Sequence, residues 1–150
     1  MIFFTGLLFY FAFLQPKVFD GLSMDKVLPF KKYRKTGLTR DHSLELKSRL
    51  LDVMEKDKPY LNSELRIAHL AKQLNLSRHH MSQVINEHFD LSFFDFINQY
   101  RVEEAKKMMV EDDHLNMTEI LYSSGFNNRV SFYKAFKKFT KITPSEYRVQ

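Results

Sequence analysis

A pattern of short helix, tight turn and second helix occurs twice in this chain, and it restricts the fold more than any other feature. Apolar residues at helical spacing predict the first copy over 63–90 and the second over 117–148. A long helix predicted over 92–110 joins the two copies. Shifts of 50 residues up to the turn and 51 residues beyond it superpose the apolar positions, pairing Leu70 with Ile120, Leu76 with Phe126, Met81 with Phe132 and Ile85 with Phe136. The expected fold is therefore all-α, with two helix-turn-helix units joined by a long linker helix.

The individual helices follow from the same spacing and from residues that cap helix ends. Ser63 and Ser77 are the predicted N-caps of the two helices in the first unit, because a serine hydroxyl accepts a hydrogen bond from a free backbone N–H of the first turn. We expect helices over 43–56, 63–74, 77–89, 92–110, 117–124 and 128–139. Residues 41–62 thus form an amphipathic helix and a connection, and residues 63–150 form the repeated domain.

The composition excludes several classes of function. Four glycines are too few for a glycine-rich phosphate loop, and the absence of cysteine excludes disulfides, a thiol nucleophile and a cysteine-ligated zinc. The six histidines include no pair four residues apart. The acid pairs at 103–104 and 112–113 are neighbours in sequence, and such neighbours do not share a helix face. We therefore expect no catalytic residue, no metal and no cofactor.

Charge is unevenly distributed along the chain, which has a formal net charge of +5 and a pI near 9.3. Residues 17–40 carry seven Lys/Arg and two Asp/Glu, a net charge of +5. Residues 41–113 carry ten and fourteen, a net charge of −4, and residues 114–150 carry six and two, a net charge of +4. Two basic zones therefore flank an acidic middle, which favours a polyanionic partner.

The second helix of each unit is predicted to bury one face and leave the other free. The buried faces are expected to hold Met81, Val84 and Ile85 with His88 or Phe89 in the first copy, and Phe132, Ala135, Phe136 and Phe139 in the second. The free faces are expected to hold Arg78, His79, Ser82, Gln83 and Asn86 in the first copy, and Arg129, Val130, Ser131, Tyr133, Lys134, Lys137 and Lys138 in the second. Such donors and cations suit a helix that enters the DNA major groove. Periodicity alone leaves two solvated faces of a helical bundle as the alternative.

Residues 1–15 form a strongly apolar segment, in which five of the thirteen residues over 2–14 are phenylalanine. As a helix this run rises about 20 Å, short of the roughly 30 Å hydrocarbon core of a bilayer. A cleaved signal peptide is one interpretation, but the segment lacks a basic start and a small-residue cleavage site. A buried core helix is another, but it needs burial on every face. We favour a third, a short apolar membrane helix that precedes the repeated domain.

Residues 16–40 are predicted to form a basic linker, which contains two prolines, two glycines and the run PFKKYRK. Basic residues lie only on the carboxyl side of the apolar segment, so the positive-inside rule places residues 17–150 in the cytoplasm. The linker is either a solvated charged stretch or a patch held near anionic lipid. If the apolar segment is not inserted, the whole chain is expected in the cytoplasm.

The repeated region resembles the DNA-binding domain of AraC/XylS-type bacterial transcription regulators. The resemblance covers about residues 63–148 and is carried by the runs LAKQLNLSRHHMSQVINEHF, FFDFINQYRVEEAKKMM and SSGFNNRVSFYKAFKKFTKITPSEYR. It implies a sequence-specific regulator without enzymatic activity, whose two recognition helices enter adjacent major-groove segments of double-stranded DNA. It also implies RNA polymerase as a partner. The apolar segment and basic linker resemble those of membrane-tethered members, which implies a place at the bacterial inner membrane.

The resemblance also implies which side chains contact DNA. Contacts to bases fall on His79, Ser82 and Gln83 in the first unit and on Arg129, Val130 and Lys134 in the second. Contacts to the DNA backbone fall on Arg78, Asn86, Lys137 and Lys138. Glutamine suits adenine, whereas arginine or lysine suits guanine, because their hydrogen-bonding groups match the edges of those bases.

Three positions depart from the family pattern. Asp90 and Lys141 stand where the family usually has glycine after each recognition helix, and a left-handed backbone there costs about 1 kcal/mol at each. Leu121 stands where a small alanine is usual, which predicts a shift in the packing of that helix.

The alternative function, from another class, is a membrane-anchored helical module whose free helix faces bind protein. A DNA reader loses affinity steeply as salt rises, and such a module does not. Residues 1–62 are too short for the ligand-binding barrel usual in the family and show no strand pattern. The oligomeric state stays open, and the helix over 43–56 is a candidate for pairing two chains.

Overall fold

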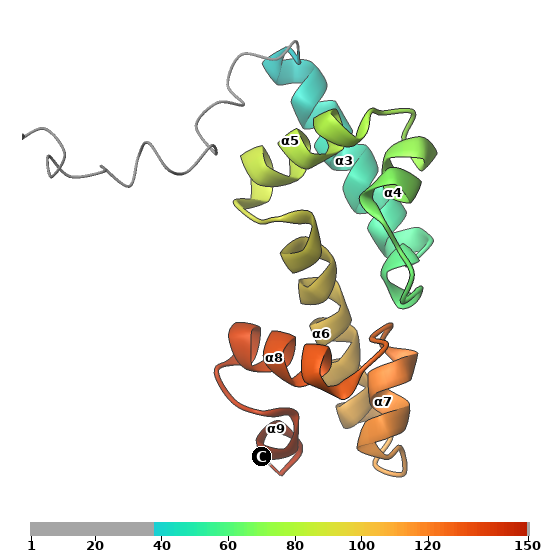
Figure 1. The fold of residues 1–150 in the computed structure, drawn as a ribbon, viewed down its shortest axis with the longest axis vertical. Coiled ribbons are helices and arrows are strands. Elements are labelled where there is room, and N and C mark those ends of the chain that lie inside the picture. The colour runs from blue at the N-terminus through green and yellow to red at the C-terminus, as the bar shows by residue number, and fades with distance from the viewer. Residues whose placement is uncertain (1–37, 150) are drawn as a thin grey trace, which may run out of the picture. The chain divides into compact units, whose positions relative to one another are not determined.

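The structure is a computed structural model that describes residues 38–149 (Figure 1). The apolar segment over 1–15 and the basic linker as far as residue 37 lie outside the described residues. Within 38–149 every regular element is helical: α3 (Arg40–Lys56), η3 (Pro59–Leu61), α4 (Ile67–Gln73), α5 (Arg78–Phe89), α6 (Phe93–Glu111), α7 (Met117–Ser123), α8 (Arg129–Thr140) and α9 (Pro144–Arg148). The all-α prediction is confirmed for this part of the chain. Among these helices none is long and apolar enough to cross a bilayer.

The first helix-turn-helix unit, α4 and α5, shares one core with α3 and the start of α6. This whole group of helices is called the first unit from here on. Leu46, Leu50 and Met54 of α3 are fully buried in it, together with Leu70, Met81, Val84, Ile85, Phe96 and other apolar residues. A polar contact also joins α3 to α5, because the Oγ of buried Ser43 lies 2.8 Å from the Nε2 of His88 on α5. The apolar side of α3 is thus used inside the unit, so that side is not free to pair two chains.

In the second unit α7 and α8 pack against α6, and α9 packs against α8. A row of aromatic rings runs through its core, with centroid separations of 5.2 Å for Phe126–Phe132, 5.8 Å for Phe132–Phe136 and 5.5 Å for Phe136–Tyr147. All three ring pairs meet edge to face, which is a favoured geometry for aromatic side chains. Leu121 is buried in the same core. The row explains why α8 needs phenylalanine at these spacings.

The turns of the two units are built alike, as the repeat predicts. Asn75 has a φ of 56° and Gly125, fifty residues later, has a φ of 91°. In each turn the next amide donates back to the preceding helix, from Leu76 to the carbonyl of Ala71 and from Phe126 to the carbonyl of Leu121. The recognition helices also end alike, because Asp90 and Lys141 have φ values of 55° and 70°. The backbone is therefore left-handed at both positions where the family usually has glycine.

The start of α4 differs from the sequence prediction. Ser63 does not cap a helix over 63–74; it lies in a turn, and α4 begins at Ile67 after the N-cap Arg66. The side chain of Asn62 accepts a hydrogen bond from the amide of Glu64, which holds this stretch in a turn. Local propensity is overridden here because the carbonyl of Asn62 is also held by Arg101 from α6.

Candidate nucleic-acid interface

Each recognition helix begins at a side-chain cap that sets its direction out of the preceding turn. Ser77 Oγ accepts from the amide of His80 at 3.1 Å at the start of α5, and Asn128 Oδ1 accepts from the amide of Ser131 at 2.8 Å at the start of α8. Figure 1 shows α5 next to the amino end of α6 and α8 crossing α6 farther along, with α4 to the right of α5 and α7 to the right of α8 in this view. Both helices predicted to read DNA therefore pack against α6.

The outward face of α8 is cationic and carries no acid. Arg129, Val130, Lys134 and Lys137 are all exposed, and α8 contains no aspartate or glutamate. Val130 is 77% exposed although it is apolar, so it contributes nothing to the core of the unit. Cations with an exposed apolar side chain among them match what a major groove offers, namely phosphates, guanine edges and thymine methyl groups.

Arg129 is held in place by its neighbours on the same helix. Its Nη2 donates to the hydroxyl of Tyr133 at 3.3 Å, and its guanidinium lies 5.0 Å from the centroid of the Tyr133 ring. The same hydroxyl lies 3.3 Å from the Oγ of Ser145, the second residue of α9. The hydrogen bond with Ser145, and secondarily Arg129, lowers the pKa of Tyr133. Arg129 is therefore pre-positioned at the start of α8.

Lys138 points toward α6 and not only toward solvent. Its Nζ lies 2.6 Å from Oδ1 of Asp95 in the first turn of α6. The hydrogen bond from Lys138 lowers the pKa of Asp95, with a smaller contribution from Ser92. Lys138 is still 53% exposed, so a contact to a DNA phosphate competes with this ion pair.

The first recognition helix presents fewer polar side chains than predicted. Arg78 and His79 are exposed, and Ser82 and Asn86 are half-buried. The prediction that Gln83 faces outward is wrong, because this residue is only 8% exposed. Helices α3, α4 and α6 all pack against α5, and a polar residue beside an apolar stripe is covered when neighbours close around it. Hydrophobic periodicity does not predict the burial of a polar side chain by neighbouring helices.

Two residues of this surface were not found from the sequence. The sequence analysis assigns no DNA contact to Tyr133, but its position four residues after Arg129 is the spacing at which helical side chains meet. Asp95 left no sequence signal, because it lies 43 residues from Lys138. Among the described residues, no group of three or more His, Asp or Glu side chains is arranged to hold a metal ion.

A family model described as a helix-turn-helix domain matches residues 70–150, which is more than half of the chain. The chain belongs to the AraC-type family of DNA-binding transcription regulators. Members of this AraC-type family regulate transcription and are not enzymes.

Similar proteins cover the same region. The Msm operon regulatory protein of Streptococcus mutans is 35% identical over 86 residues, which are 57% of this chain and 31% of that protein. An HTH-type transcriptional regulator of Staphylococcus aureus is 32% identical over 89 residues, 59% of this chain and 12% of that protein. The chain therefore matches less than a third of the length of these curated relatives.

Solved structures share the AraC-type fold. The C-terminal domain of the two-component response regulator yesN from Fusobacterium nucleatum is 30% identical with a TM-score of 0.60, covering 69% of this chain and 98% of that one. The C-terminal domain of AraT, a response regulator from Geobacillus stearothermophilus, is 26% identical with a TM-score of 0.61, covering 69% and 84%.

Proposed function

We propose that this chain is a sequence-specific reader of double-stranded DNA whose helices α5 and α8 enter adjacent major-groove segments. The observation that carries the proposal is the outward face of α8, where Arg129, Lys134 and Lys137 are exposed and no acidic residue belongs to the helix. A helix of this kind repels basic proteins and attracts phosphate. The AraC-type membership adds that the relatives of this domain bind DNA.

The proposed base contacts come from the starts of the two helices. In the second unit Arg129 and Lys134 donate to guanine, and Val130 contacts a thymine methyl group. In the first unit His79 and Ser82 contribute, and Gln83 is left out because it is buried. The proposed backbone contacts are Arg78, Asn86 and Lys137, with Lys138 joining them when a phosphate displaces Asp95.

The test is a selection of binding sites from a random duplex library with the full chain. We expect an enriched site with two blocks about one helical turn apart, since each recognition helix reads one groove segment. A single enriched block would show that one unit does not read bases. If no sequence is enriched and binding barely responds to salt, the proposal is wrong and a helical module that binds protein takes its place.

The salt dependence of affinity identifies the phosphate contacts on the selected duplex. Lys137→Ala is expected to lower the slope of log affinity against log salt by about one. Lys107→Ala is the matched control, because it removes one exposed lysine that pairs with Glu111 on α6 and belongs to neither recognition helix. It should leave the slope near that of the unaltered chain.

We also propose RNA polymerase as a partner at a promoter that carries the selected site. AraC-type membership supports this, because the family regulates transcription. Transcription by the purified polymerase with and without the chain tests it. A change in transcript yield that Arg129→Ala removes supports the proposal, and an unchanged yield contradicts it.

A further proposal from the sequence is that residues 1–15 attach the chain to the bacterial inner membrane, with the DNA-binding domain in the cytoplasm. It is supported by the apolar segment and by the basic linker after it. The full chain should float with anionic phospholipid vesicles at high salt, and a variant with Phe9→Asp and Phe11→Asp should not. Flotation lost at high salt would assign the attachment to the linker alone, against the proposal.

A further inference from the structure

The connection between α3 and α4 lies against the middle of α6. This connector, residues 57–62, belongs to the first unit, because Tyr60 is 5% exposed within the first core. The side chains of Lys58 and Tyr60 and two carbonyls of the connector bond to α6, near the stretch between Ile97 of the first core and Val102 of the second. The backbone of Lys58 is left-handed there, with a φ of 45°.

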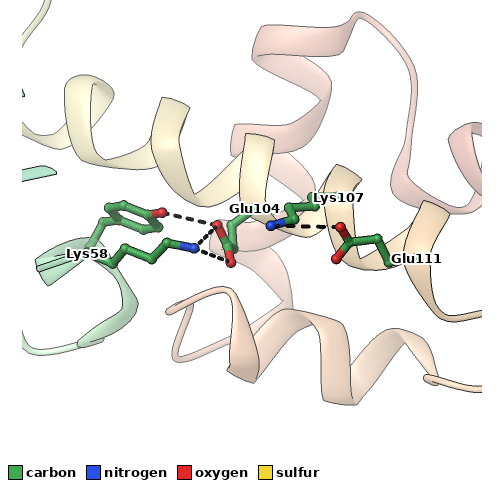
Figure 2. Close-up of polar contacts among 5 residues, drawn as sticks. Lys58, Glu104, Lys107 and Glu111 are labelled. Carbon is green, nitrogen blue, oxygen red and sulfur yellow. Dashed lines mark hydrogen bonds and ion pairs between the residues drawn. The ribbon is translucent and has the colours of Figure 1, made fainter. Parts of the chain in front are cut away.

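The carboxylate of Glu104 on α6 accepts hydrogen bonds from two side chains of the connector. Lys58 Nζ lies 3.2 Å from Oε1 and the hydroxyl of Tyr60 lies 3.0 Å from Oε2. Figure 2 shows Glu104 facing Lys58, while Lys107 and Glu111 pair along the same helix. Glu104 is 14% exposed and Glu111 is 63% exposed, so Glu104 is sheltered from water and Glu111 is not.

Arg101, one turn earlier on α6, holds the connector by its backbone. Its Nε donates to the carbonyl of Tyr60 at 2.7 Å and its Nη2 donates to the carbonyl of Asn62 at 2.8 Å. The guanidinium also lies 5.6 Å from the centroid of Phe126, in the turn of the second unit. Burial lowers the pKa of this guanidinium. Arg101 therefore touches the first unit and the second at once.

Gly125 brings the turn of the second unit onto the same connector. A Cβ atom at this position would lie 2.3 Å from the carbonyl oxygen of Tyr60 and 2.9 Å from the Cα of Leu61. Only glycine allows backbone to approach backbone so closely, and the φ of 91° also favours it. The two units therefore meet directly, outside the linker helix that joins them.

We propose that the connector is a brace that sets the position of α8 relative to α5, and so the spacing between the two DNA segments that the chain reads. Glu104 and Arg101 are positioning residues in this proposal, because they act on DNA only through the placement of the two units. A single helix of nineteen residues bends, whereas contacts on both units at one point of it restrict that bending. The part that concerns DNA spacing rests on the proposed function above.

The first test measures the brace without DNA. The chain has no cysteine, so Arg78→Cys and Lys134→Cys place one spin label on each recognition helix and nowhere else. We expect one narrow distance distribution in the full chain and a broader one when Glu104→Ala is added. Glu111→Ala, which removes a glutamate from the same helix, should leave the distribution narrow. Glu104→Gln keeps acceptor oxygen for Tyr60 and should restore part of the narrowing.

The second test measures spacing on DNA with the selected duplex and with duplexes whose spacer is one base pair longer or shorter. One base pair moves the second block by about 3.4 Å and turns it by about 35°. On the duplexes with a changed spacer, we expect the unaltered chain and Glu111→Ala to bind at least about tenfold more weakly than on the selected duplex. Glu104→Ala should bind them less than about threefold more weakly. Arg101→Lys is the second variant if Glu104→Ala fails to fold, because it keeps the charge and loses the forked donors.

The outcomes separate the brace from the proposed function. A folded Glu104→Ala variant with a distribution as narrow as that of the unaltered chain overturns the brace, and so does equal broadening by Glu111→Ala. Broadening by Glu104→Ala alone supports the brace even if the unaltered chain selects no two-block site. In that case the proposed function fails and the brace stands.

Discussion

Arg129 shows how one side chain can be prepared for its contact before the partner arrives. The ring and hydroxyl of Tyr133 restrict an arginine that otherwise samples many rotamers, and Ser145 restricts Tyr133 in turn. An arginine already ordered loses less conformational entropy when it binds a base edge. The contact is local to α8 and α9, so it does not depend on how the two units are placed.

Arg129→Ala is expected to weaken binding to the selected duplex by about 1–3 kcal/mol, or roughly five- to 150-fold, and to relax preference at one base position. Tyr133→Phe removes only the hydroxyl and should cost less, with base preference kept. Affinities for duplexes substituted at each position measure both effects. Uniform weakening across all substituted duplexes would make Arg129 a phosphate contact and not a base contact.

The Lys138–Asp95 pair predicts a pH dependence of stability. Because the bond from Lys138 lowers the pKa of Asp95, its stabilisation is present above the ordinary carboxyl pKa and is lost as the pH falls through the lowered value. Both groups are partly exposed, so we expect Asp95→Asn to cost at most about 1 kcal/mol at neutral pH. Urea unfolding at several acidic pH values should show the difference from the unaltered chain shrinking toward zero. A difference that stays constant to the acid limit would contradict this.

Among the secondary-structure elements, α5 and α8 have backbone strain at their carboxyl ends. Asp90 and Lys141 terminate α5 and α8 in the left-handed region, where a lysine side chain is disfavoured and aspartate is better tolerated. Each helix still ends in an ordered turn, because the amides of Asp90 and Lys141 donate to the carbonyls of Asn86 and Lys137. The packing of the helices outweighs the local cost.

Lys141→Gly is therefore expected to raise the free energy of unfolding by about 1 kcal/mol, and Asp90→Gly by less. Lys134→Gly is the matched control, because the same change inside α8 should lower stability by about 0.7–1 kcal/mol. Urea denaturation followed by circular dichroism measures all three. A loss of stability at Lys141 would mean that its side chain contributes more than the backbone costs.

At the scale of the whole described region, α3 is part of the DNA-binding unit and not a separate segment before it. Leu46, Leu50 and Met54 are buried where α3 packs against α5 and η3, and each contributes about 1.5–3 kcal/mol by burial. Their sum is comparable with the whole stability of a small domain, about 5–15 kcal/mol. The first recognition helix therefore depends on residues that precede the region of resemblance.

Leu50→Ala is expected to destabilise the protein by about 2–5 kcal/mol, because it leaves a cavity in the first core. Leu44→Ala on the same helix is the control, since Leu44 is exposed and its loss should cost less than about 0.5 kcal/mol. Thermal unfolding measures both. Equal small losses at the two positions would show that α3 does not hold the unit together.

Helices α3 to α8 and their order were predicted from the sequence, whereas η3 and α9 were not. The Ser77 cap and the helical spacing of apolar positions depend on a few neighbouring residues, so a pattern is enough to find them. It also predicted the cationic face of α8, because that face depends on one helix alone.

Which polar side chains are covered, and which contact distant partners, depends on how the helices pack together. Gln83 is buried by neighbouring helices, and Lys138 lies against Asp95. Ser63 does not cap a helix, because it lies in a turn that Arg101 holds through the carbonyl of Asn62. The connector, too, joins residues more than forty positions apart. Such contacts depend on distances between elements, which come from the packing of the whole core and which no local pattern of residues encodes.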